Sequence, residues 1–391
     1  MGNKFYNGDT DMIDLHLVGS RIRELRQKKG LTQSEFAEVL SVSFQAVSNW
    51  ERGVTPPDIE NLLRIASYFG ILVDTLLAPG GEDLYLGIDG GGTKTEFTVV
   101  SSSGHIIKHS ITSGSNPNDI GYENTERLIT DEVIKIVASS PSLKGIFCGV
   151  AGMATGDYAE RLLTALKRLC PQAEIRVSSD AFNLFGLHDD ADMVLIGGTG
   201  SVVFVRDGEE YKRLGGWGYL FDRAGSAYDI GRDAVCNALE EEDGNRDRSL
   251  LSLMLLKRMN ASTMWEHINS LYSGGRAYIA SFATTVFEAY RSGDEAAIGI
   301  IDQNAKALAG LLNSAVRLYG VKPIATVSGG LFEHHAYIMN KHIRAYSATE
   351  LKTSDLPPVY GACKQACMIA SCKVADSFYD NFKKTYGELK K

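Results

Sequence analysis

The sequence predicts an α/β protein built from two similar lobes, preceded by a small all-helical domain. Short helical patterns fill residues 18–77 without a strand pattern between them. From residue 84 onward, strand and helix patterns alternate, which is typical of α/β folds. A strand, a glycine-rich turn and a second strand occur at 84–101 and again at 193–205, about 110 residues later. This repetition indicates a duplicated lobe.

Composition and charge narrow the class of protein. The chain has 391 residues, with 40 Lys and Arg against 48 Asp and Glu, and 44% of its residues are hydrophobic. That apolar content excludes disorder over most of the length, and the length suggests two or three compact units. No apolar run reaches the ~18 residues of a membrane-spanning helix, so we expect no membrane partner. The polar, acidic start is not a secretory signal, and sparse cysteines without metal-binding spacing fit a reducing cytoplasm.

The helical domain contains two short helices joined by a tight turn. Thr32 is a good N-cap for the first of them, with Glu35 placed to complete a capping box. This layout can put the second helix into the major groove of DNA. The residues at the start of that helix are Ser43, Phe44, Gln45 and Asn49. Gln and Asn side chains can read the edge of adenine, so these positions are candidate base contacts.

The helix before this pair is strongly basic. Its positive charges, which we expect to meet DNA phosphates, are Arg21, Arg23, Arg26, Lys28 and Lys29. A helical dimerisation module with a solvated basic face remains the alternative at this point.

The stretch IRELRQKKGLTQSEFAEVLSVSFQAVSNWERG, with the helix that follows it, resembles the Cro/C1-type (XRE) helix-turn-helix family over residues 18–77. The resemblance implies operator DNA as a partner, with Gln33 at a phosphate and Gln45 at a base. It also implies structural roles for Trp50 and Glu51. A homodimer is expected because such domains usually read two half-sites.

A Pro/Gly stretch at 78–81 reads as a linker and divides the chain. We therefore expect the helix-turn-helix domain and its linker at 1–79, a first lobe at 83–187, and a second lobe with a terminal helix at 188–391.

Three glycine turns, each preceded by a strand, form a candidate phosphate-binding set. Glycine lets the backbone approach an anion closely, and its N–H groups can point at phosphate oxygens. The candidate nucleotide-binding residues are Gly91, Gly92, Thr93, Lys94, Gly198, Thr199, Gly200, Gly329 and Gly330. Asp89 ends the first of these strands and could hold Mg²⁺, usually through water. Neither the Walker A spacing nor the dinucleotide fingerprint fits, and three unrelated hairpin turns are the alternative.

Asp180 follows the strand at 174–178 and is the candidate general base. A base at that place would take the proton of an attacking hydroxyl while a phosphoryl group is transferred. The residues alone leave a second reading open, in which Asp180 is only the N-cap of a short helix over 180–187.

Residues 84–370 resemble the BadF/BadG/BcrA/BcrD-type ATPases, and among them the N-acetylglucosamine kinases. The motifs that carry the resemblance are GIDGGGTKTEFTVV, SGSNPND, GVAGM, SSDA, LIGGTGS, GGWGYLFDRAGSAYDIG and SGGLF. The resemblance implies two ribonuclease-H-like, actin-like ATPase lobes that use ATP and Mg²⁺ to phosphorylate a hydroxyl of an amino sugar. It places Asp89 by Mg²⁺ and Asp180 as the base, with Gly329 and Gly330 beside adenosine. It also places Asn116, Trp217 and Gly218 at the sugar.

One motif departs from the kinase pattern, which has Asp and Glu where this chain has Arg223 and Ala224. An arginine cannot accept a hydrogen bond from a sugar hydroxyl. Arg223 could bind an acidic group on the sugar, or the pocket could serve a non-catalytic sensor of sugar or ATP. In a third reading, Asp222 replaces the missing carboxylate by a one-residue shift while Arg223 faces solvent.

Overall fold

The structure is a computed structural model of the chain, and it describes residues 15–71, 73–77, 83–139, 143–208 and 210–389. The expected linker at 78–81 lies outside these described residues. The chain separates into two compact units, Met1–Asp83 and Leu84–Lys391, which we call the first and the second unit.

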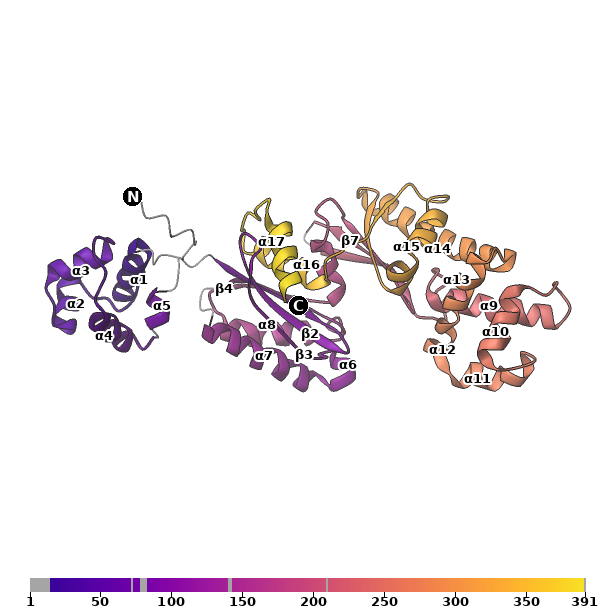
Figure 1. Cartoon of the computed structure of the whole chain (residues 1–391), viewed down its shortest axis with the longest axis horizontal. Helices are drawn as coiled ribbons and strands as arrows, with labels where there is room; N and C mark the ends of the chain where they lie inside the picture. The colour runs from indigo at the N-terminus through magenta and orange to yellow at the C-terminus, as the bar shows by residue number, and fades with distance from the viewer. Residues whose placement is uncertain (1–14, 72, 78–82, 140–142, 209, 390–391) are drawn as a thin grey trace, which may run out of the picture. The chain divides into compact units, whose positions relative to one another are not determined.

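The described part of the first unit contains helices and no strand (Figure 1). Its helices are α1 (Leu15–Lys28), α2 (Gln33–Leu40), α3 (Phe44–Glu51), α4 (Ile59–Phe69) and α5 (Val73–Leu77). The capping box expected at the start of α2 is present, because Thr32 Oγ1 accepts from the amide of Glu35 and the Glu35 carboxylate accepts from the amide of Thr32. Phe36, Val47 and Trp50 are buried in a single small core.

The second unit contains two five-stranded sheets with the same strand order. The first sheet consists of β1 (Leu84–Gly90), β2 (Lys94–Ser101), β3 (Ile106–Ser113), β4 (Leu143–Val150) and β5 (Glu174–Ser178), in the order β3-β2-β1-β4-β5. The second consists of β6 (Met193–Gly197), β7 (Ser201–Asp207), β8 (Glu210–Gly215), β9 (Ile324–Ser328) and β10 (Glu350–Lys352), in the order β10-β9-β6-β7-β8. In each sheet the first three strands along the chain pair antiparallel and the last two are added parallel. The duplicated lobe and the α/β class are therefore confirmed.

Helices cover both faces of the first sheet (Figure 1). One face packs on α7 (Tyr122–Ser139) and α8 (Tyr158–Leu169). The other packs on α16 (Pro358–Ile369) and α17 (Phe378–Glu388), which come from the end of the chain. The boundary expected at 187/188 assigns these two helices to the second lobe, whereas they lie on the first sheet. The physical reason is that Tyr85 and Phe147 point to a second apolar face, which no helix within 84–187 covers.

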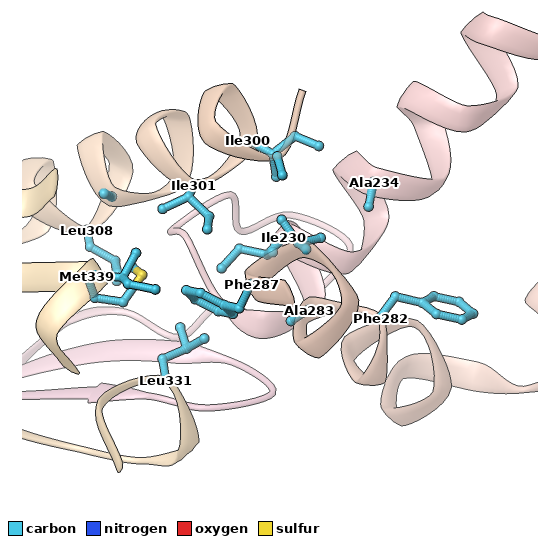
Figure 2. Close-up of a cluster of buried hydrophobic side chains, with 14 of the residues drawn as sticks. Ile230, Ala234, Phe282, Ala283, Phe287, Ile300, Ile301, Leu308, Leu331 and Met339 are labelled. Atoms are coloured by element: carbon cyan, nitrogen blue, oxygen red, sulfur yellow. The ribbon is translucent and has the colours of Figure 1, made fainter. Parts of the chain in front are cut away.

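The helices of the second lobe surround a large apolar core. They are α9 (Ala227–Glu242), α10 (Leu250–Met259), α11 (Ile268–Ser273), α12 (Gly275–Ser281), α13 (Ala283–Arg291), α14 (Glu295–Tyr319) and α15 (Gly330–Ile343). Figure 2 shows Phe287 of α13 among Ile301 of α14 and Leu331 and Met339 of α15. Two 3-10 segments, 180–186 and 265–267, and the short helix α6 (Pro117–Ile120) complete the described elements. No helix within the described residues is long and apolar enough to cross a membrane.

Candidate functional site

The first glycine turn joins β1 to β2 and is open to solvent. The amide of Gly91 donates to the carbonyl of Lys94 at 2.9 Å, and the carbonyl of Gly91 accepts from the amide of Ser115 at 2.9 Å. Gly92, Thr93 and Lys94 are exposed. A Cβ placed on Gly114 would lie 2.0 Å from the carbonyl oxygen of Gly92, so two chain segments meet here backbone to backbone. The segment at 114–115 therefore supports one side of the turn, and residues 92–94 remain exposed to solvent. A turn that binds phosphate needs such an exposed side.

Asp89 lies mostly buried at the end of β1, directly before this turn. Asn183 Nδ2 donates to its Oδ1 at 2.5 Å. Burial raises the pKa of Asp89 to about 7; the hydrogen bond from Asn183 opposes this, and the nearby carboxylates of Asp180 and Glu96 add to it. Lys94 is committed elsewhere, because its Nζ lies 2.5 Å from Glu96 Oε1.

A divalent cation fits this place. A carboxylate that is costly to ionise by itself is stabilised by a nearby cation. Within the described residues no group of three metal-binding side chains gathers, so Mg²⁺ would be held by Asp89 together with phosphate and water oxygens.

Asp180 is the first residue of the 3-10 segment Asp180–Gly186, next to Asp89. The N-cap is Ser179, whose Oγ accepts from the amide of Ala181. Ser179 Oγ also donates to Asp180 Oδ1 at 2.9 Å. Asp180 is half-buried, and its charge acts on Asp89. The prediction that Asp180 is the N-cap is therefore wrong. Its carboxylate does not cap the segment and accepts a hydrogen bond from Ser179 instead.

Asn116 belongs to the same neighbourhood. It caps α6, with Oδ1 accepting from the amide of Asn118 at 3.0 Å and Nδ2 donating to Asp119 at 2.8 Å. A Cβ on Gly152 would lie 2.4 Å from Asn116 Oδ1, and one on Gly92 would lie 3.1 Å from Asp119 Oδ2. The structure thus brings the GGGTKT, SGSNPND and GVAGM motifs of the first lobe into contact.

The second and third glycine turns adjoin in the second lobe. The amide of Gly198 donates to the carbonyl of Gly200, and the carbonyl of Gly198 accepts from the amide of Ala227, both at 2.9 Å. Gly329 has φ +90°, and a Cβ there would lie 2.6 Å from the carbonyl oxygen of Gly197. Only glycine adopts this conformation without strain and allows so close an approach. Gly329 and Gly330 thereby lie beside the turn that contains Thr199.

The loop that carries Trp217 and Gly218 is closed by Asp222. Asp222 Oδ2 accepts from the amides of Gly216 and Trp217, at 2.6 and 3.0 Å. Arg223 is exposed and forms no ion pair with any described residue, and Ala224 is 4% exposed. Trp217 is 65% exposed and stacks on the Arg213 guanidinium, 4.4 Å from the ring centroid. One carboxylate oxygen of Asp222 is thus engaged in hydrogen bonds that stabilise the loop.

In the first unit, α3 presents a short polar surface. Ser43 caps the helix through the amide of Ala46 at 3.1 Å, and Phe44 and Gln45 are exposed. Asn49 is half-buried and accepts from Arg52 Nη2 at 2.7 Å. Gln33 Nε2 donates to Glu51 Oε2 at 2.7 Å, which leaves its second N–H and its carbonyl oxygen for other contacts.

The expectation that the whole basic run meets phosphates is wrong for Arg26. Arg26 is 7% exposed, and its Nε and Nη2 donate to the two oxygens of Glu51 at 2.5 and 2.9 Å. Arg21 also turns inward, donating to the carbonyl of Leu76 at 3.1 Å. Trp50 and Glu51 are 5% and 7% exposed, in agreement with their expected structural roles.

Asn183 is the residue at this site that the sequence reasoning missed. Its side chain is fully buried and touches Asp89, yet its position in the sequence indicates only a polar residue in a short helix. The one feature of the sequence that could have indicated it is that Asn183 follows Asp180 by three residues.

Comparisons with known proteins match the two units separately. The sequence profile of the BadF/BadG/BcrA/BcrD ATPase family matches residues 86–366, and a helix-turn-helix profile matches residues 22–76. N-acetylmuramic acid/N-acetylglucosamine kinase of Clostridium acetobutylicum is 26% identical over 268 residues, which are 66% of this chain and 88% of that protein. HTH-type transcriptional regulator ImmR of Bacillus subtilis is 40% identical over 60 residues, 15% of this chain and 47% of that protein.

Among solved structures, one from Porphyromonas gingivalis, named provisionally as an N-acetylglucosamine kinase, is similar with a TM-score of 0.52. It is 21% identical, covering 72% of this chain and 98% of that chain. At this identity the likeness concerns the fold alone.

Proposed function

Because the chain belongs to the BadF/BadG/BcrA/BcrD ATPase family and carries a helix-turn-helix domain, we propose that it is a transcriptional regulator fused to an ATP-dependent amino-sugar kinase. In the proposed reaction a sugar hydroxyl attacks the γ-phosphorus of ATP. A new O–P bond forms, the bond to the leaving ADP breaks, and the hydroxyl proton passes to Asp180. The protein contributes mainly positioning and charge stabilisation.

The observation that supports this proposal best is the meeting of Asp89, the first glycine turn and the Asp180 segment in one lobe. Asn183, three residues after Asp180, hydrogen-bonds to Asp89 at 2.5 Å. A metal-binding carboxylate and a base that act on one phosphoryl group must lie near each other, and the charge of Asp180 acts on Asp89. When bound, Mg²⁺ would neutralise phosphate charge. Around it the exposed amides of Gly92 and Thr93 would hold phosphate oxygens, whereas the Gly91 amide is already hydrogen-bonded to the Lys94 carbonyl and the Lys94 ammonium to Glu96.

The remaining predicted residues have roles on the nucleotide and sugar sides. We assign Gly198, Thr199 and Gly200 to the β- and γ-phosphates, and Gly329 and Gly330 to adenosine. The sugar would be bound by Asn116, Trp217 and Gly218, with Asp222 and Arg223 beside them. The second and third glycine turns adjoin each other, which supports the assignment of both to the nucleotide. The contact of Asn116 with the Gly152 loop supports the assignment of Asn116 to the sugar.

The first unit supplies the proposed DNA-binding activity. Ser43, Phe44, Gln45 and Asn49 would face base edges, with Gln33 near a phosphate. We propose a homodimer on two operator half-sites, since one such helix reads only a few base pairs.

A second candidate function is a transcription factor whose kinase-like unit only senses sugar or ATP. The 216–225 loop favours it, because Asp222 is engaged with two backbone amides and the side chain of Ala224 has no polar group. Arg223 adds a cation that is free to bind an acidic ligand group, so the loop supplies little hydroxyl recognition.

Turnover by the wild-type protein separates the kinase from the sensor, and Asp180→Asn tests the proposed base. Wild-type protein with MgATP and a panel of N-acetylglucosamine, glucosamine and N-acetylmuramic acid should release ADP with at least one sugar. The variant should lose 10²- to 10⁴-fold in turnover, the usual contribution of a general base, while sugar binding by calorimetry persists. Unchanged turnover in the variant would falsify Asp180 as the base. Ligand-dependent DNA affinity without turnover would favour the sensor.

A further inference from the structure

The side chain of Asn183 occupies an unusual position. It is 0% exposed, and its Nδ2 donates to Asp89 Oδ1 at 2.5 Å and to the carbonyl of Gly149 at 3.3 Å. Both partners are acceptors, which settles that the NH₂ end of the amide points to them. The other end, Oδ1, is buried and has no hydrogen-bond partner among the described residues.

The surrounding backbone leaves room for this side chain and little else. Asp89 and Gly149 are neighbours in the parallel register of β1 and β4. A Cβ on Gly149 would lie 2.0 Å from Asn183 Oδ1, and its three nearest atoms all belong to the Asn183 side chain. On the other side, a Cβ on Gly361 of α16 would lie 2.0 Å from the Asn183 carbonyl oxygen. Two glycines therefore flank Asn183.

An apolar side chain of the same shape would fill this space at lower cost. A buried oxygen without a partner loses its hydrogen bonds to water and gains none in return. The contact with Asp89 is different, because its oxygen accepts at 2.5 Å and the hydrogen bond becomes charge-assisted, and so stronger, when a bound cation ionises the carboxylate. The benefit of the amide thus lies at its Asp89 end.

We propose that Asn183 is a positioning residue that fixes the orientation of the Asp89 carboxylate relative to Asp180. Because both Asn183 and Asp180 lie on the segment Asp180–Gly186, one 3-10 segment positions the base and the side chain that hydrogen-bonds to the metal-binding carboxylate. The inference rests on the proposed kinase function and adds a residue that neither the motifs nor the family resemblance includes.

Calorimetry of ATP binding tests the proposal without turnover. Asn183→Ala should weaken ATP binding about tenfold in the presence of MgCl₂ and leave it unchanged in EDTA, because only the metal-dependent part passes through Asp89. Asn237→Ala is the matched control, since Asn237 is also buried but hydrogen-bonds to Glu241 in α9. Equal weakening in both buffers, or an equal effect in the control, would show a general loss of structure and overturn the proposal.

A double variant separates positioning from packing. Gly149→Ala alone should lower the melting temperature, because its methyl group meets the Asn183 side chain. In Gly149→Ala/Asn183→Ala the new methyl group fills the space that the amide leaves, so the melting temperature should recover. The Mg²⁺-dependent affinity for ATP should stay low. Recovery of both quantities together would reduce Asn183 to a space-filling residue.

The proposed function can fail separately from this inference. If wild-type protein binds MgATP but releases no ADP with any amino sugar, the kinase proposal fails and the calorimetry still decides the role of Asn183. If wild-type protein turns over sugar and Asn183→Ala behaves like Asn237→Ala, only the role of Asn183 is refuted.

Discussion

The two units each contain a carboxylate withdrawn from solvent, and they treat it in opposite ways. In the first unit Glu51 accepts hydrogen bonds from Arg26 and from Gln33, so its charge is balanced by an ion pair and a further hydrogen bond. In the second unit Asp89 receives the neutral amide of Asn183 and forms no ion pair with a described residue, while burial raises its pKa to about 7.

The difference is the one expected between a structural charge and a functional one. A buried carboxylate with its own cation is satisfied, and it fixes how α1 and α3 pack. One without a cation is costly to ionise, and a metal ion can lower that cost. By this reasoning the Arg26–Glu51 pair maintains the fold of the first unit, and for Asp89 we propose the role of a metal ligand.

Removing the partner of a buried charge should have the largest effect on stability. Glu51→Ala leaves the Arg26 guanidinium buried and unpaired, which typically costs about 3–5 kcal/mol. We expect the first unit to lose most of its stability and its DNA affinity, while the second unit melts as before. Scanning calorimetry and binding to a duplex at low salt measure this. A variant whose first unit melts like wild type would make the ion pair dispensable and break the comparison.

The pH dependence of stability sharpens the comparison at Asp89. In EDTA, native Asp89 keeps its proton up to about pH 7, whereas an aspartic acid in the unfolded chain has lost it above its ordinary pKa of 3.8. The native state then binds more protons, so the free energy of unfolding falls as pH rises through this window, by at most about 1.4 kcal/mol per unit.

Asp89→Asn removes this slope. The free energy of unfolding of the variant, measured by urea titration, should therefore rise relative to that of wild type between pH 4 and 7. The difference between the two proteins isolates Asp89, because the other titrating groups are common to both. Parallel pH profiles would mean that Asp89 is not held in the uncharged form.

An exposed ion pair in the first unit should matter least. Glu60 and Arg64 lie 2.6 Å apart on α4, with side chains 75% and 48% exposed. Such pairs contribute about 0.3–0.5 kcal/mol because solvent screens them. We expect Glu60→Ala to shift the melting of the first unit only slightly, and so to serve as the control for Glu51→Ala. A loss as large as that of Glu51→Ala would show that burial does not set the value of these pairs.

The regular elements could be predicted because their signals are local. The helix at 158–169 and the strand at 174–178 have the residues expected from their patterns, and glycines mark the turns after β1, β6 and β9. The contacts that build the site are not local, and for that reason they were missed. Arg26 reads as a surface charge until α3 brings Glu51 against it, and Asn183 has no visible partner until β1 ends beside it. The cover of the first sheet by α16 and α17 likewise depends on residues far along the chain.

The affinity of the protein for ATP, measured by calorimetry with MgCl₂ and with EDTA, tests the role of Asp89 most directly. Wild-type protein should bind ATP at least tenfold more tightly with Mg²⁺ than without it. Asp89→Asn should lose this difference, and Asp131→Asn, an exposed control on α7, should keep it. If Asp89→Asn retains the full Mg²⁺ dependence, the uncompensated carboxylate is not the metal site, and the contrast between the two units has no functional meaning.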